Sequence, residues 1–111
     1  MIDASAIDEI LRIYKKHGWS LRRVLLSSAA AGAANSFGDA DIRESDIDAL
    51  WFSRASRASG EAWELRALTP TPLALLEVIP VETDEPERES ILNEVEGRLR
   101  EMLIRGRAKN N

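Results

Sequence analysis

The chain of 111 residues has the length of one domain, and its 44% hydrophobic and 31% charged residues are an ordinary globular balance. Its net charge of −4 disfavours nonspecific binding to nucleic acid, so we expect no nucleic-acid partner. No apolar run approaches the ~18 residues that a membrane span needs, so we expect no membrane-spanning segment. With no cysteine and one histidine, the sequence excludes a disulfide, a thiolate zinc site and any site built from two imidazoles of one chain.

The first part of the chain predicts a helix followed by a strand. Four apolar residues with the spacing of one helical stripe predict a helix over 3–17: Ile7, Ile10, Leu11 and Tyr14. Gly18 ends this helix. The segment from Trp19 to Leu26 fits a strand or a second helix beginning at Ser20, and we favour the strand.

The middle of the chain predicts an alanine-rich helix, a loop and a hairpin. Residues 27–37 have high helix propensity, and residues 39–46 are polar and predict a loop. Residues 47–54 and 61–68 predict two paired strands. Any register that pairs odd with odd residues puts Trp51 and Trp63 on one face, which we expect a helix to cover. One such register sets Asp48 opposite Arg66.

The last part predicts a strand and a long helix. Residues 73–79 are apolar at both odd and even positions, which is typical of a strand covered on both faces. Residues 82–105 predict a helix with Thr83 or Asp84 as its cap, and residues 106–111 a frayed tail. We therefore expect one α+β domain over 1–105, with a mainly antiparallel sheet of three or four strands and helices packed on one face.

The second face of this sheet is expected to mediate a homodimer. Leu50, Phe52 and Leu68 lie on the even-numbered face of the hairpin, opposite the face that the helices cover. The strand over 73–79 adds either its odd or its even apolar residues to them. Because soluble monomers rarely expose an apolar patch of this size, we expect Leu50, Phe52 and Leu68 to form the dimer interface.

An alternative hypothesis is that the chain is an enzyme, with a candidate site formed by Asp48, Glu64 and Arg66. An Asp on one strand followed by Glu-x-basic on the next resembles the pattern of PD-(D/E)XK nucleases, and this resemblance implies that the carboxylates hold Mg²⁺ to activate water. Arg66 stands where that family usually has lysine. Arginine stays protonated, so it cannot act as a general base.

Two further sequence patterns are candidates for a binding site, one for a cation and one for DNA. The acidic segment 39–48 offers carboxylates to a cation, but it does not fit the EF-hand loop, because Glu44 and Leu50 stand where Gly and Glu are required. A helix-turn-helix over 10–27 would place Arg22 and Arg23 against DNA, and it is the second alternative function.

Three segments resemble short uncharacterised bacterial proteins of about this length: Ile47–Arg54, Glu61–Arg66 and Thr71–Val78. The resemblance implies a bacterial origin and carries no activity. The start of the sequence lacks a basic region followed by an apolar one, so we expect a cytoplasmic protein. In the absence of a complete catalytic set, the leading hypothesis is a non-catalytic protein-interaction or regulatory module, acting as a homodimer with an unknown partner protein and without cofactor or metal.

Overall fold

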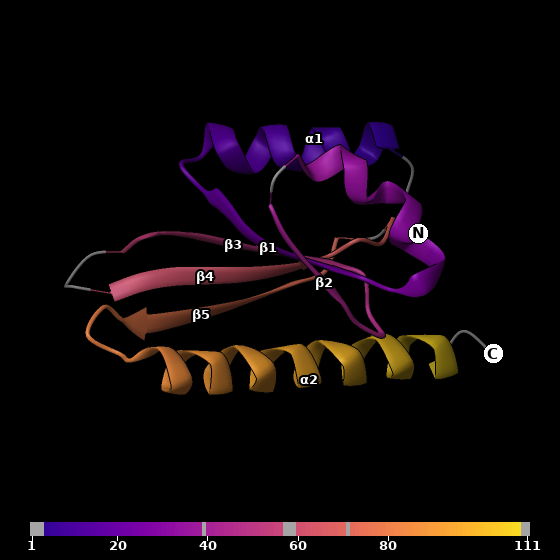
Figure 1. The fold of residues 1–111 in the computed structure, drawn as a ribbon. Coiled ribbons are helices and arrows are strands. Elements are labelled where there is room, and N and C mark those ends of the chain that lie inside the picture. Colours follow the sequence, from indigo (N-terminus) through magenta and orange to yellow (C-terminus); the bar gives the residue numbers. More distant parts are fainter. Residues whose placement is uncertain (1–3, 39, 57–59, 71, 110–111) are drawn as a thin grey trace.

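The computed structural model describes residues 4–38, 40–56, 60–70 and 72–109, with helices on both sides of one sheet (Figure 1). The sheet has five strands in the order β2-β1-β3-β4-β5, rather than the predicted three or four. The elements in chain order are α1 (Ala4–Lys16), β1 (Ser20–Leu26), the 3₁₀ helix η1 (Ser28–Phe37), β2 (Asp41–Glu44), β3 (Ala49–Ala55), β4 (Gly60–Ala67), β5 (Ala74–Pro80) and α2 (Glu85–Lys109). The predicted α+β class is confirmed.

The chain turns from α1 into β1 at Gly18. The φ angle of Gly18 is 85°, a conformation that residues with a Cβ rarely adopt. The backbone N–H of Trp19 then donates to the carbonyl of Tyr14 at 2.9 Å, which closes the end of the helix. The prediction of a strand after this turn is confirmed, since β1 lies between β2 and β3.

The segment that was expected to be a polar loop contains the edge strand β2. It pairs in parallel with β1, with Val24 opposite Ile42. Parallel neighbours need a crossover connection, and η1 supplies it while packing Ala30 and Phe37 against the sheet. Three of the four residues of β2 are charged, so the strand has no hydrophobic period that sequence analysis could detect.

Strands β3, β4 and β5 form an antiparallel meander. Odd residues of β3 pair with odd residues of β4, so that Trp51 lies opposite Leu65 and Ser53 opposite Trp63. The prediction that Trp51 and Trp63 share a face is confirmed, because their rings meet edge to face with centroids 6.1 Å apart. Both belong to the core beneath α2.

The predicted pairing of Asp48 with Arg66 is wrong. Arg66 lies opposite Leu50, and the carbonyl of Asp48 instead accepts a hydrogen bond from the N–H of Leu68 at 2.9 Å. The true register differs from the predicted one by two residues. Because such a shift keeps every side chain on its face, the hydrophobic pattern alone cannot distinguish the two registers.

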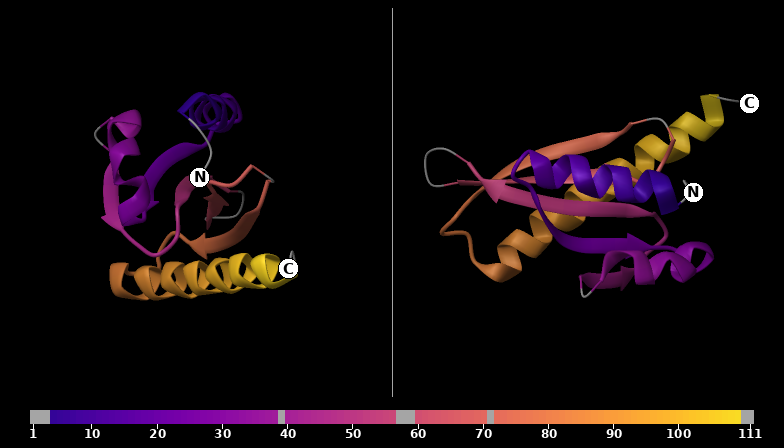
Figure 2. Two further views of the ribbon diagram at one scale, coloured as in Figure 1. Left: turned by 90° about the vertical axis from the view of Figure 1, so that its right-hand side faces the viewer. Right: turned by 90° about the horizontal axis from the view of Figure 1, so that it is seen from above.

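Helices cover both faces of the sheet, which corrects the expected packing on one face (Figures 1 and 2). We call the cluster between the sheet and α2 the α2 core, and it includes Trp51, Trp63, Leu65, Leu92 and Leu99. The cluster under α1 and η1 is the α1 core, and it includes Ile7, Phe37, Leu50, Phe52 and Leu68.

The predicted dimer interface therefore lies inside the protein. Leu50, Phe52 and Leu68 are at most 2% exposed, because α1 and η1 pack on them. The predicted interface is wrong because the prediction placed all helices on the face that α2 covers by itself. A second copy cannot reach these three side chains in the folded chain.

Helix α2 begins at one of the two predicted caps but ends later than predicted. Asp84 caps it, since its side chain accepts the N–H of Glu87 at 3.0 Å. The helix continues past the expected end at Arg105 to Lys109, and residues 110–111 lie outside the described residues. None of the described helices is both long and apolar enough to span a membrane.

The position of Trp63 in the α2 core predicts its contribution to stability. Replacing it by alanine should lower the free energy of unfolding by about 3–5 kcal/mol, because the change leaves a large cavity. Denaturant titration measures this value. Val81→Ala, at a residue 62% exposed, is the control and should change stability by no more than about 0.5 kcal/mol. A similar small loss for Trp63→Ala would contradict the assignment to the core.

Phe52→Glu provides a test of the buried even-numbered face. An interface residue would tolerate the change, whereas a core residue leaves an unpaired carboxylate among apolar groups. We expect the variant to lose the folded circular dichroism spectrum at room temperature. Leu76→Glu places the same charge on an exposed residue of the same face and should remain folded. A folded Phe52→Glu chain would show that α1 does not cover this position.

Candidate functional site

Strand β5 is one edge of the sheet, and half of its backbone groups face away from β4. The N–H of Ala67 donates to the carbonyl of Leu73 at 2.9 Å, so Leu73 and every second residue after it bond to β4. The alternate residues Ala74, Leu76 and Val78 therefore direct N–H and C=O groups outward. No other strand lies beside them in the part of the chain that the structure describes.

The side chains of these three residues lie on the face that carries α1. Leu76 is 59% and Val78 53% exposed, since α1 and η1 lie over other strands and the α1 core contains no residue of β5 (Figure 2). On the opposite face, Leu75 and Ile79 pack into the α2 core. The even face of β5 is thus an apolar strip beside an open backbone edge.

The two edges of the sheet differ in charge. On β2, Asp41, Arg43 and Glu44 leave only one uncharged residue, whereas β5 has a single charged residue, Glu77. The side chain of Glu77 lies on the α2 side, where it pairs with Arg98 at 3.4 Å. Charged side chains on an edge strand discourage pairing with another chain. The exposed face of β5 lacks that protection.

A groove of about 680 Å³ lies between β5 and the end of α1, and we call it the α1–β5 groove. Leu76, Val78 and Ala62 line its side, and His17, Trp19 and Arg54 line its end. The guanidinium of Arg54 lies 4.7 Å from the centre of the Trp19 ring and donates to the carbonyl of His17 at 3.0 Å. The groove therefore combines an apolar side with a cationic end.

Tyr14 links α1 to β4 beside this groove. Its ring stacks on Phe52 with centroids 3.9 Å apart, and its hydroxyl donates to the carboxylate of Glu64. Burial raises the pKa of Tyr14 above its ordinary value of 10.0, and the hydrogen bond and negative charge of Glu64 raise the pKa further. The folded chain therefore favours the neutral phenol.

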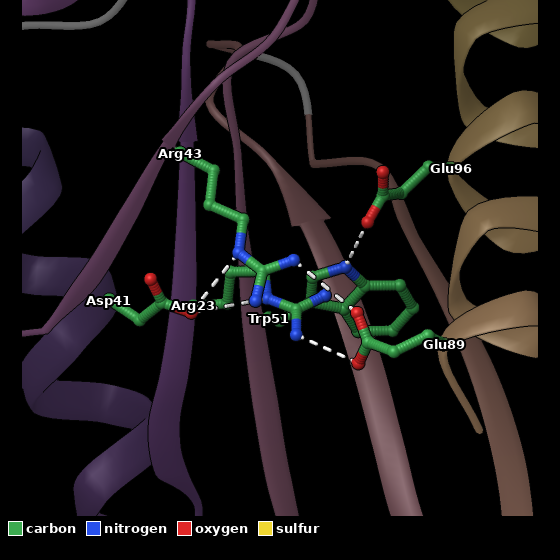
Figure 3. A network of polar contacts seen from close by, with 6 residues as sticks. All are labelled: Arg23, Asp41, Arg43, Trp51, Glu89 and Glu96. Atoms are coloured by element: carbon green, nitrogen blue, oxygen red, sulfur yellow. Dashed lines mark hydrogen bonds and ion pairs between the residues drawn. The ribbon is translucent and has the colours of Figure 1, made fainter. Parts of the chain in front are cut away.

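Polar residues on the opposite face join α2 to the sheet (Figure 3). Arg23 of β1 donates to Glu89 at 2.9 Å, and Arg43 of β2 donates to the same carboxylate at 3.3 Å. The hydrogen bond from Arg23 is the main reason that the pKa of Glu89 is lowered. Trp51 Nε1 donates to Glu96 at 2.8 Å. These contacts hold α2 and the edge strand β2 in place, and we assign them a structural role.

The structure separates the two carboxylates of the predicted nuclease site, Asp48 and Glu64. Glu64 lies opposite Phe52, four residues from Asp48 along the strand direction, which is about 14 Å at ~3.4 Å per residue. The carboxylate of Asp48 accepts two hydrogen bonds from Ser27, one from the backbone N–H at 2.7 Å and one from the side-chain hydroxyl at 3.2 Å. Asp48 thus holds the start of η1, while the carboxylate of Glu64 accepts a hydrogen bond from Tyr14.

The predicted helix-turn-helix over 10–27 is wrong, because its second helix is strand β1. Arg22 lies at an irregularity in the pairing of β1 with β3, and its guanidinium lies 4.6 Å from the centre of the Trp63 ring. The side chain of Arg23 is 11% exposed and paired with Glu89. Neither arginine lies on a helix that could enter a DNA groove.

The carboxylates of the acidic segment 39–48 are directed to separate partners. Asp41 pairs with Arg43 at 3.2 Å, and Asp46 pairs with Arg100 at 2.7 Å. Asp39 lies outside the described residues. Over the described ranges, no three or more His, Cys, Asp or Glu side chains are placed to hold one metal ion.

The predicted apolar surface combined hairpin residues, which are buried, with one set of residues from the strand over 73–79, which carries the exposed part. Because residues 73–79 are apolar at both parities, their pattern left open whether Leu76 and Val78 or Leu75 and Ile79 face the second side. The register with β4 and the position of α2 decide this. The proline residues at both ends of this strand were the available signal of an edge position.

Comparison of the chain with protein-family models, with curated proteins and with solved structures finds no match. The functional assignment therefore depends on the geometry of the molecule alone.

The raised pKa of Tyr14 predicts a loss of stability at high pH. Below its ordinary pKa of 10.0 both the folded and unfolded chains keep the phenol proton. Above that value the unfolded chain loses the proton first, so the free energy of unfolding falls as pH rises. We expect Tyr14→Phe to show a shallower decline in urea titrations across this range.

Lysine ionisation contributes equally to both chains and cancels in the comparison. Because the sequence has one tyrosine, the ultraviolet absorbance of the phenolate reports on Tyr14 alone. Ionisation of the folded chain at the ordinary tyrosine value would contradict the contact between Tyr14 and Glu64.

Proposed function

We propose that the chain is a cytoplasmic, non-catalytic protein-interaction module that binds another polypeptide strand along the β5 edge. The open edge carries the proposal, because Ala74, Leu76 and Val78 combine outward backbone groups with exposed side chains. A cysteine-free sequence needs no disulfide to fold, as suits a reducing compartment.

The edge supplies both affinity and selectivity for an extended strand. Outward N–H and C=O groups bond to the backbone of an added strand regardless of its sequence. Every second side chain of that strand then lies on the same face as Leu76 and Val78, next to the α1–β5 groove. We expect apolar residues at these alternate positions.

The homodimer expected from the sequence would require a surface other than the predicted one. Since Leu50, Phe52 and Leu68 are buried, self-association has to use another part of the molecule. Among the described elements, β5 is the edge strand whose exposed face is apolar, whereas β2 is the charged one.

Selection from a library of random extended peptides displayed on phage tests the proposal without a known partner. Peptides selected on the unmodified chain should show alternating apolar residues. Leu76→Lys places a charge on the β5 edge and should abolish their binding. Ile42→Lys makes the same kind of change on the β2 edge and should leave the binding unchanged.

The proposal fails if no peptide is enriched on the chain at a dilution at which it is monomeric, or if the selected peptides bind the Leu76→Lys chain as well as the unmodified one. Circular dichroism of both lysine variants must match that of the unmodified chain. Leu76 and Ile42 are 59% and 37% exposed, so neither substitution disturbs either core.

A further inference from the structure

We infer that the strand bound at the β5 edge is β5 of a second copy of this chain, antiparallel to the first and with Leu76 on the twofold axis. This inference rests on the proposed function and adds the identity and register of the partner. It would join the two sheets into one continuous sheet, with the exposed even faces of the two β5 strands side by side.

The hydrogen-bonding groups of β5 are symmetric about Leu76. The outward residues are Ala74, Leu76 and Val78, so an antiparallel copy centred on Leu76 sets Leu76 opposite the partner's Leu76 and Ala74 opposite the partner's Val78. Every outward N–H then faces a carbonyl of the other copy. The strand thus pairs with itself without leaving an outward donor unbonded.

Two prolines disfavour the neighbouring registers. A shift of two residues in one direction sets Pro80 opposite Ala74 of the partner, and a shift in the other direction sets Pro72 opposite Val78 of the partner. Proline has no N–H, so either shift loses a hydrogen bond at each end of the paired segment. Pro72 and Pro80 are each four residues from Leu76. The register centred on Leu76 therefore keeps more hydrogen bonds between the two strands than either shifted register.

The side chains favour the same register. On the even face, Leu76 meets Leu76 and Val78 meets Ala74, which are apolar cross-strand pairs. On the odd face, Glu77 lies opposite Leu75 of the partner. The register shifted toward Pro80 would instead set Glu77 directly opposite its own copy, and like charges in that position are destabilising.

The same self-complementarity favours a second copy over an unrelated peptide. Pairing covers Leu76 and Val78 of both copies, the exposed apolar residues of the edge, by one symmetric contact. The edge strand β2 lacks these features, since it is short and carries charges of both signs on its exposed surface. A peptide of another protein remains an outcome that the experiments below distinguish.

Light scattering coupled to size-exclusion chromatography tests the self-association. At concentrations of several hundred micromolar, the unmodified chain should give twice the single-chain mass of 12.4 kDa. Leu76→Lys should give the single-chain mass, and Ile42→Lys should keep the doubled mass. Because Leu76 is exposed, the lysine variant should keep the circular dichroism spectrum of the unmodified chain.

Oxidative cross-linking tests the register, which is possible because the sequence contains no cysteine. Directly opposite residues have Cα atoms about 5.5 Å apart, within the ~4.4–6.8 Å that a disulfide spans. Leu76→Cys should therefore cross-link to itself. A mixture of Ala74→Cys and Val78→Cys chains should cross-link to each other, whereas either one alone should not, because its copies lie about 14 Å apart along the strand.

A single-chain mass for the unmodified protein overturns the inference. So does a doubled mass that survives Leu76→Lys, or a cross-linking yield that is the same for every cysteine position. If the chain is monomeric and yet selects peptides that Leu76→Lys rejects, the proposed function stands and the second copy is wrong. If the peptide selection also fails, both are wrong.

Discussion

Strand β3 is buried from Ala49 to Ser53 on both of its faces, and this burial determines what the rest of the chain must provide. A strand with apolar side chains on both sides needs a layer of packing on each. Helix α2 supplies one layer, and α1 together with η1 supplies the other. Phe52 and Trp51, adjacent in sequence, therefore belong to different cores.

The two layers differ in length, and this difference leaves part of one face open. With 25 residues at ~1.5 Å each, α2 is about 37 Å long, whereas the 13 residues of α1 reach about 20 Å. On the α1 side, the contact between Tyr14 and Glu64 lies where the covered part of the sheet ends. Beyond it lie Leu76 and Val78, exposed beside the α1–β5 groove.

The same arrangement of layers explains where the charged side chains lie. Arg23, Arg43 and Glu89 connect β1, β2 and α2, and they place their charges between layers or along the β2 edge. Glu77 of β5 is likewise drawn to the α2 side by Arg98. As a result, the exposed side of β5 is left without a charge, and the surface best suited to bind another strand lies at the edge farthest from β2.

Much of the element order could be predicted from local pattern. The stripe of Ile7 and Ile10 identifies α1, and the alternation of residues 61–67 identifies β4. Burial of Trp51 and Trp63 on one face follows from the period of two in a strand. Strand β2 could not be predicted, because a short charged edge strand is formed by its pairing with β1 and not by hydrophobic periodicity.

The candidate site depends on choices that local pattern leaves open. The sequence determined that residues 73–79 form an apolar strand bounded by prolines, and that the hairpin has two apolar faces, since these are properties of side-chain type and spacing. Only the tertiary structure decided that α1 covers Leu50, Phe52 and Leu68 while leaving Leu76 and Val78 exposed. It also decided that Asp48 lies far from Glu64. The physical reason is that register and helix placement are set by packing between distant segments, and a shift of two residues or a change of the covered face leaves the period of every strand unaltered.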